Sequence, residues 1–291
     1  MNVRLFGVTR RSITIAAAMV GLVSLVLGAN AALNKRTVGA ATATASSTIS
    51  DVASKASRLA LVIGNGHYPD ASAPLTQPIN DARALTTALR HDGFDVDVVE
   101  DATRDDMARA VQRLKARIKP DSTVMLYFGG YGVQVGRESY MIPVDAAIWK
   151  EADIRRDGVS VEAVLDVMKE KGAHAKLVVI DASRRNPYER RFRGYSRGLA
   201  PINVPDNALI LSSATPGKVA DDAKGGNSLL VSELLKNLNS KASGAEAVFT
   251  KTRVAVTRAS DGEQIPAMSS SLVEDIPFGT GLVSTADKAG S

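Results

Sequence analysis

The sequence predicts an α/β fold in which a mostly parallel central sheet is flanked by helices on both faces. Short apolar runs recur through residues 58–278, and several lack the alternation of a half-exposed strand, as expected for strands buried on both faces. Segments with apolar residues at three- and four-residue steps, typical of amphipathic helices, separate these runs. Strands that alternate with helical segments of about 10–15 residues favour parallel pairing of the strands.

The first half of this region alternates strand and helix. Leu59–Ile63 is a continuous apolar run that ends at Gly64, which predicts a buried strand. We expect Asn80 and Asp81 to cap a helix that stops at Gly93. A strand, a helix and a strand are then expected at Phe94–Val99, Thr103–Ile118 and Thr123–Phe128.

The second half continues the same alternation after one irregular segment. Tyr140–Val144 is a short extended piece, and Pro143 predicts that it lies at a sheet edge because proline cannot donate to a central ladder. A helix, two strands and two helices are expected at Val161–Met168, Leu177–Ile180, Ala208–Leu211, Leu230–Leu238 and Val248–Val256.

The N-terminal residues 1–34 have the pattern of an export signal or membrane anchor. Arginines, including Arg10 and Arg11, precede the uncharged stretch Ser12–Asn34, and Ala29–Ala31 offers a small-x-small cleavage site. The stretch is also long enough to span a bilayer, which needs about 20 residues. We expect a periplasmic protein, or one tethered to the inner membrane and facing away from the cytoplasm. Residues 35–57 are an expected linker and 279–291 an expected flexible tail.

Charge and composition exclude several classes of function. The net charge of +5 comes from the basic excess of residues 1–57, so the folded body is neutral overall and nucleic-acid binding is not expected. The chain has no cysteine, which excludes a thiol nucleophile, and three scattered histidines predict no metal site. The glycine-rich loops lack the spacing of dinucleotide and phosphate-binding motifs, so no cofactor is expected.

Two loops that follow predicted strands carry a family resemblance. Asp181–Pro187 (DASRRNP) resembles the bacterial caspase-like segment Asp-Ala-Cys-Arg-x-Asn-Pro, with Ser183 at the cysteine. Tyr127–Gln134 (YFGGYGVQ) resembles Tyr-Tyr-Ala-Gly-His-Gly-Val-Gln, with Tyr131 at the histidine. The two positions are 52 residues apart, and the caspase histidine lies about 50 residues before its cysteine. The chain is therefore similar to the caspase/metacaspase-like peptidase family.

The resemblance implies a caspase-type fold with the catalytic loops and a peptide groove at the carboxyl edge of the sheet. Tyr131 and Ser183 are then vestigial dyad positions. An alcohol is a weaker nucleophile than a thiolate, and a phenol with an ordinary pKa near 10 is a poor base. We expect a pseudoenzyme that binds a peptide or protein partner without cutting it. The groove candidates are Gly130, Gly132, Asp181, Arg184 and His67.

Two alternatives stay open at this stage. His67 follows the first strand and could serve Ser183 as a substitute base in a serine hydrolase, or it could be an ordinary loop histidine. The arginines after Ser183 could clamp an anionic ligand, or they could be a solvated loop. These are Arg184, Arg185, Arg190, Arg191, Arg193 and Arg197. The sequence does not predict an oligomeric state.

Overall fold

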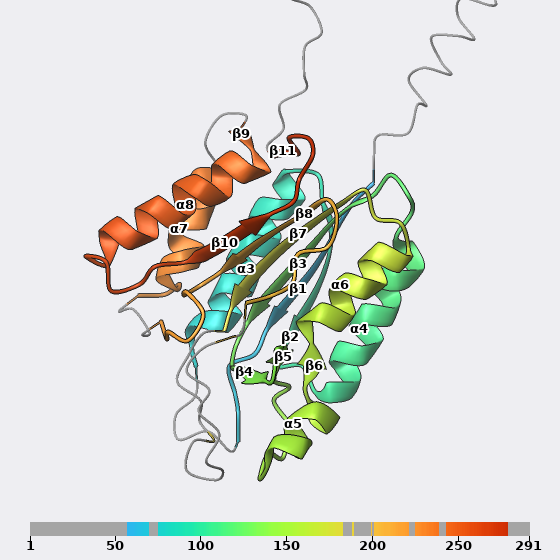
Figure 1. Cartoon of the computed structure of the whole chain (residues 1–291), viewed down its shortest axis with the longest axis vertical. Helices are drawn as coiled ribbons and strands as arrows, with labels where there is room; N and C mark the ends of the chain where they lie inside the picture. The colour runs from blue at the N-terminus through green and yellow to red at the C-terminus, as the bar shows by residue number, and fades with distance from the viewer. Residues whose placement is uncertain are drawn as a thin grey trace, which may run out of the picture. The chain divides into compact units, whose positions relative to one another are not determined.

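A six-stranded sheet forms the centre of the computed structural model, which describes residues 57–69, 75–182, 188, 199, 201–220, 225–238 and 243–278. The strand order is β10-β8-β7-β3-β1-β2 (Figure 1). All neighbours pair in parallel except β10, which is antiparallel to β8. The strands are β1 (Arg58–Gly64), β2 (Asp95–Glu100), β3 (Thr123–Gly129), β7 (Ala175–Asp181), β8 (Ala208–Ser212) and β10 (Ala267–Ser270). The predicted fold class, a mostly parallel sheet flanked by helices, is confirmed.

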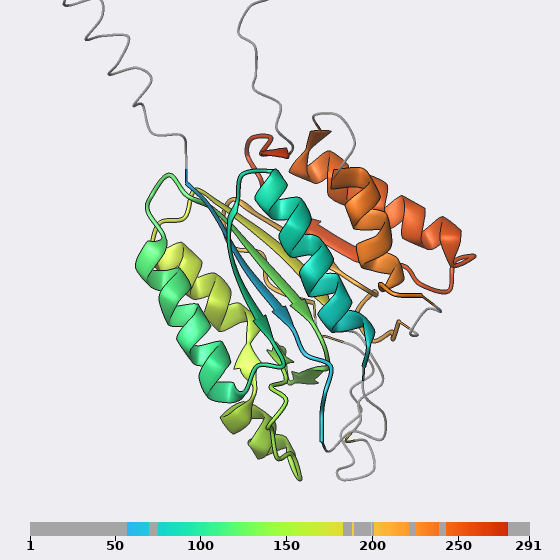
Figure 2. The same ribbon diagram turned by 180° about the vertical axis from the view of Figure 1, so that it is seen from behind.

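Helices cover both faces of this sheet, and each face has its own apolar core. One core joins alternate residues of the strands, such as Val62 and Tyr127, to α3, α7 and α8 (Figure 2). The other joins the remaining positions, such as Leu61 and Phe128, to α4 and α6. The helices are α3 (Gln77–His91), α7 (Leu229–Leu238), α8 (Ala245–Ala259), α4 (Arg104–Arg117) and α6 (Val161–Glu170). Burial on both faces explains why β1 and β3 are apolar along almost their whole length, whereas β2 and β10 at the sheet edges carry polar residues.

The predicted start of one helix, α4, is confirmed, and the predicted start of another, α3, is wrong. Thr103 caps α4 as predicted, in a capping box with Asp106. The predicted cap of α3 at Asn80 and Asp81 is wrong, because α3 begins at Gln77 with Pro78 in its first turn. Proline is suited to this place since it lacks an N–H that a helix start leaves unbonded.

The segment around Tyr140 forms a second, smaller sheet. Its order is β4-β5-β6, with β4 (Gly132–Val135), β5 (Glu138–Met141) and β6 (Val159–Ser160) paired antiparallel. The prediction of an edge strand at Tyr140–Val144 is therefore wrong. β5 is the central strand, and Pro143 lies beyond its end, where no ladder bond is required. Short elements α5 (Glu151–Asp157), β9 (Ser243–Gly244) and β11 (Pro277–Phe278) were not predicted.

The expected export signal or anchor, the expected tail and all of the expected linker except Ser57 lie outside the described residues, as do Ser183 and Arg184. Among the helices that the structure describes, none is both long and apolar enough to cross a membrane.

Candidate functional site

The carboxyl ends of β1, β3 and β7 place the predicted loops side by side. Gly64 pairs with Gly129, and Gly129 pairs with Asp181, so the three strands end at the same level. Beyond these ends, the N–H of Gly130 donates to the Asp181 carbonyl at 3.3 Å, and the N–H of Gly132 donates to the Ala182 carbonyl at 3.1 Å. The backbone of Tyr131 therefore lies directly beside the residues that lead into Ser183.

The Tyr131 side chain is a core residue in this structure. The residue is only 8% exposed, and its ring meets the ring of Tyr68 edge to face, with 4.8 Å between the centroids. The Tyr68 hydroxyl donates to the Ile142 carbonyl at 2.9 Å and accepts from the Tyr131 N–H at 3.0 Å. Tyr131 thus belongs to an apolar cluster that also contains Val133.

The glycines beside Tyr131 are required by close packing. A Cβ on Gly130 would lie 2.5 Å from the Tyr68 hydroxyl oxygen. A Cβ on Gly132 would lie 2.8 Å from Leu199 Cδ2 and 2.9 Å from the Ala182 Cβ. These distances are shorter than van der Waals contact, so a side chain at either position would separate the ends of the strands.

His67 is held by a carboxylate on the far side of β1 from β7. Its Nδ1 lies 2.5 Å from Asp101 Oδ2, and Asp101 Oδ1 accepts the N–H groups of Gly66 and His67, both at 2.9 Å. Partial burial acts to raise the pKa of Asp101, but these hydrogen bonds outweigh it and hold the pKa below its ordinary value. The His67 side chain is 74% exposed.

The sheet order separates His67 from the loop after β7. Asp101 directly follows β2, on the opposite side of β1 from β3 and β7. Two strand spacings, about 10 Å in all, lie between β1 and β7. The imidazole therefore points toward the β2 end of the carboxyl edge, and not toward Ala182.

The other two histidines lie at the opposite, amino edge of the sheet. His91 is the last residue of α3, and its Nδ1 is 3.7 Å from Asp92 Oδ1. His174 precedes β7 and pairs with Glu274. Since the chain has three histidines and all three are described, no imidazole lies where β3 and β7 end.

An acidic pair lies under the same carboxyl edge. Asp81 on α3 is 0% exposed, and Asp181 at the end of β7 is 2% exposed. Asp81 Oδ1 accepts the Asn227 side-chain amide at 2.8 Å and the Ser228 N–H at 3.0 Å. Burial, together with the negative charge of Asp181, raises the pKa of Asp81 to about 7. Two carboxyl groups, those of Asp81 and Asp181, therefore lie buried at this edge, and the negative charge of one disfavours ionisation of the other.

Sequence reasoning named Asp181 as a groove residue but took Asp81 for a helix cap. A signal was present in the sequence. Asp81 precedes Ala82 and lies four residues before Leu85, so it falls on the apolar face of its helix. A carboxylate on such a face has to be buried, and buried carboxylates are rare without a partner or a role.

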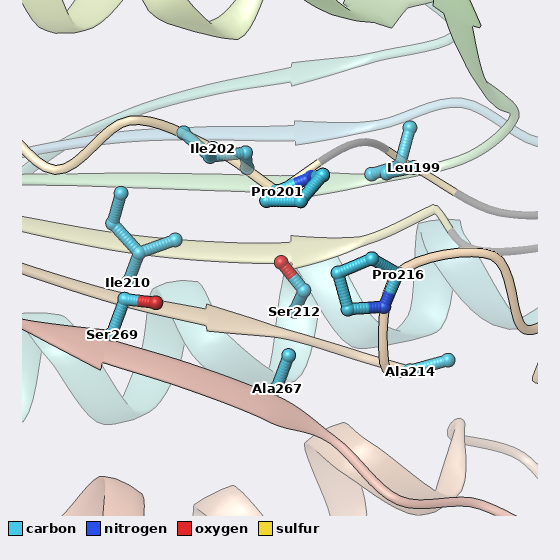
Figure 3. A pocket seen from close by; sticks show the side chains of 9 residues that line it. All are labelled: Leu199, Pro201, Ile202, Ile210, Ser212, Ala214, Pro216, Ala267 and Ser269. Carbon is cyan, nitrogen blue, oxygen red and sulfur yellow. The ribbon is translucent and has the colours of Figure 1, made fainter. Parts of the chain in front are cut away.

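An apolar recess lies on the other face of the sheet. Figure 3 shows it between the segment that carries Leu199, Pro201 and Ile202 and the strands β8 and β10. Its volume is about 130 Å³. Ile210 in its floor packs with the α4 and α6 core, whereas Asp81 belongs to α3 on the opposite face. The recess and the acidic pair are therefore separate features. The recess is lined by Leu199, Pro201, Ile202, Ile210, Ser212, Ala214, Pro216, Ala267 and Ser269.

The described residues contain no cluster of three or more histidine, aspartate or glutamate side chains that could hold a metal ion. Where β3 and β7 end, the described residues offer the buried acidic pair, the backbone groups of the glycine loop and the buried phenol of Tyr131.

Comparison with known proteins places this arrangement in a family. The family model described as "Caspase domain" matches residues 57–277. Human "Mucosa-associated lymphoid tissue lymphoma translocation protein 1" is 30% identical over 133 residues, which are 45% of this chain and 16% of the human protein. The mouse homologue is 31% identical over 133 residues, with the same coverage. The match thus covers a small part of these relatives. Because the family model covers most of the chain and the fold agrees, the chain belongs to the caspase-domain family of peptidases.

Proposed function

We propose that this protein is a caspase-fold pseudoenzyme that holds a peptide or protein partner at the carboxyl edge of its sheet without hydrolysing it. The observation that carries the proposal is the position of the histidines. His67 is paired with Asp101 beyond β2, and His91 and His174 lie at the amino edge. A peptidase of this type needs a base beside its nucleophile, and the position that resembles the family histidine holds the buried Tyr131.

The backbone donors of the glycine loop after β3 support the same proposal. Acyl transfer needs N–H groups aimed at the oxyanion of the tetrahedral intermediate. The N–H groups of Gly130 and Gly132 donate instead to the carbonyls of Asp181 and Ala182. The oxygen of a reacting carbonyl would have to compete with these hydrogen bonds. The chain also has no cysteine to supply a thiolate, and none of its histidines lies at this place.

The acidic pair indicates which residue of a partner is recognised. A guanidinium or ammonium group would offset the repulsion between Asp81 and Asp181, and charge-assisted hydrogen bonds are stronger than neutral ones. An arginine fits best, because its planar fork can bond two carboxylates at once. We therefore propose a basic side chain of the partner as the ligand of this pair.

The test uses the full chain and a fluorescent peptide with one arginine, compared with the same peptide carrying citrulline. We expect anisotropy to report binding of the arginine peptide only, and mass spectrometry to show the peptide intact after prolonged incubation. Asp181→Asn should abolish binding, whereas Asp166→Asn, at an exposed position of α6, should not change it. Cleavage that disappears in Ser183→Ala would refute the pseudoenzyme.

A serine hydrolase is the second candidate, because the Asp101–His67 pair orients an exposed imidazole. The sheet order argues against it, since His67 faces away from the loop after β7. A fluorophosphonate probe separates the two proposals. The pseudoenzyme predicts no labelling of Ser183, whereas a hydrolase predicts labelling that is lost in His67→Ala.

A further inference from the structure

A short segment, Gly225–Ser228, packs against Asp81 of the acidic pair, and we refer to it as the strap. Its first half is held by two side chains of α3 through its carbonyl groups. The Gln77 amide donates to the Gly225 carbonyl at 3.5 Å, and the Asn80 amide donates to the Gly226 carbonyl at 2.8 Å. The strap thus lies along the first turns of α3, directly in front of Asp81.

The second half of the strap bonds the Asp81 carboxylate itself. The Asn227 side-chain amide donates to Oδ1 at 2.8 Å, and the Ser228 N–H donates to Oδ1 at 3.0 Å and to Oδ2 at 3.3 Å. The Ser228 hydroxyl then accepts the N–H of Val231 and caps α7. The strap therefore presents hydrogen-bond donors to Asp81, mainly N–H groups of the kind that a cationic ligand would supply.

We propose that the strap is an internal cap, in which Asn227 occupies the place of the partner's basic side chain and must be displaced when that side chain binds. This inference rests on the proposed function, since it concerns access to the same acidic pair. In the present structure both carboxylates are almost fully buried, so a ligand cannot reach them while the strap is in place.

The chemistry of the strap suits a cap that opens. Asn227 offers a neutral amide, whereas an arginine or lysine offers a full positive charge to two carboxylates. The glycines at the outer end of the strap are exposed, and a Cβ on Gly226 would meet no atom within 4 Å. Opening therefore requires the loss of a few hydrogen bonds and the exposure of little apolar surface.

The cap also makes binding depend on pH. Among the described residues, the groups that act on Asp81 are Asp181 from β7 and the Asn227 and Ser228 donors of the strap. Asp81, with a pKa of about 7, is largely protonated at pH 6 and largely ionised at pH 8. A cationic ligand prefers the ionised form, so its affinity should rise about tenfold from pH 6 to pH 8.

The decisive experiment weakens the cap at two separate places in the full chain. Asn227→Ala removes the donor to Asp81, and Asn80→Ala removes the bond to Gly226 without touching either carboxylate. Both variants should bind the arginine peptide about three- to tenfold more tightly than the wild type. Asn237→Ala is the matched control, because its amide bonds Glu233 and Thr252 within the helical layer. Its affinity should be unchanged.

Movement of the strap can be measured directly. The chain has no cysteine, so Gly226→Cys provides a single labelling site for an environment-sensitive fluorophore. We expect the arginine peptide to change the emission, and the citrulline peptide to leave it unchanged.

The outcomes distinguish the cap from the function on which it rests. If the wild type binds the arginine peptide and Asp181→Asn does not, but both strap variants keep the wild-type affinity and the label does not respond, the cap is overturned and the proposed function stands. If neither the wild type nor the strap variants bind the peptide, the proposed function fails, and the cap fails with it.

Discussion

Tyr131 and the imidazole of the family segment that its loop resembles make different demands on their surroundings. A catalytic imidazole has to exchange protons, so it needs access to a nucleophile and to solvent. The Tyr131 phenol ring instead lies edge to face against Tyr68 inside an apolar cluster. The neighbouring glycines and the Tyr68 hydroxyl are packed around this ring and its backbone. At this position the fold uses the side chain for packing.

The first prediction follows from this packing role. Tyr131→Ala should lower the free energy of unfolding by about 3–4 kcal/mol, because it removes a buried aromatic ring and leaves a cavity. Urea denaturation measures the change. Trp149→Ala is the control, since Trp149 is 65% exposed and its loss should cost less than about 1 kcal/mol. Equal effects of the two substitutions would contradict the packing role of Tyr131.

The second prediction concerns the ionisation of Asp81. Its pKa is raised from 3.8 to about 7 in the folded protein, so folding favours the protonated form. The stabilisation from protonated Asp81 is complete below pH 3.8 and is lost as the pH rises to about 7. Asp81→Asn keeps a neutral group and an acceptor in this place. It should therefore be more stable than the wild type at pH 8, by on the order of 2–4 kcal/mol.

Thermal or urea unfolding between pH 4 and pH 8 tests this sign. The difference between Asp81→Asn and the wild type should grow as the pH rises from 4 to 7. The control Asp166→Asn, on the exposed side of α6, should give a curve parallel to that of the wild type. A variant less stable than the wild type at pH 8 would show that the ionised carboxylate is stabilising.

Among the elements, α4 has the most complete helix start in the described residues. The Thr103 hydroxyl accepts the Asp106 N–H at 3.2 Å, and the Asp106 carboxylate accepts the Thr103 N–H at 3.2 Å. Hydrogen bonds from Thr103 lower the pKa of Asp106. This reciprocal cap fixes where the chain leaves the loop of Asp101, which in turn holds His67.

The third prediction compares this cap with a simpler one. Thr103→Ala should destabilise the protein by about 1–2 kcal/mol, because it removes the side-chain half of the capping box. Ser160→Ala at the start of α6 removes the bond that its hydroxyl accepts from the Ala163 N–H and the bond that it donates to the Glu162 carboxylate, and it should cost about 0.5–1 kcal/mol. Denaturant unfolding of both variants gives the comparison. A larger loss in Ser160→Ala would contradict the importance of the reciprocal pair.

At the scale of the whole molecule, the net positive charge is concentrated in the N-terminal part of the chain. The basic excess precedes residue 58, and the part that forms the sheet and its helices is neutral overall. A neutral body gives a partner no long-range electrostatic attraction, so recognition depends on local charges such as the acidic pair. The apolar stretch Ser12–Asn34, after Arg10 and Arg11, leads us to propose that the protein is exported or tethered to the inner membrane.

The fourth prediction tests this location in cells. A C-terminal reporter that is active only outside the cytoplasm should be active when fused to the full chain. Deletion of residues 1–34 should abolish that activity while leaving the fusion protein present in the cytoplasm. Activity of a reporter that works only in the cytoplasm, fused to the intact chain, would overturn the proposal.

The sequence by itself determined the fold class and the relation of the two motif loops. Apolar runs and helical periods are local patterns, because the burial of a strand or of a helix face is set by residues a few positions apart. These patterns predicted the strands and helices that flank Tyr131 and Asp181. The 52-residue spacing between Tyr131 and Ser183 pointed to the caspase-like family, and the matching family model confirmed it.

Only the tertiary structure decided which side chains meet at the carboxyl edge. Asp81 bonds Ser228, 147 residues further along the chain, and His67 bonds Asp101 because β2 lies next to β1. The order of the strands and the packing of α7 against α3 determine these contacts. Neither can be predicted from the periodic spacing of apolar residues in the sequence. The acidic pair and its strap are therefore properties of the packed molecule, since they depend on which distant segments share a buried space.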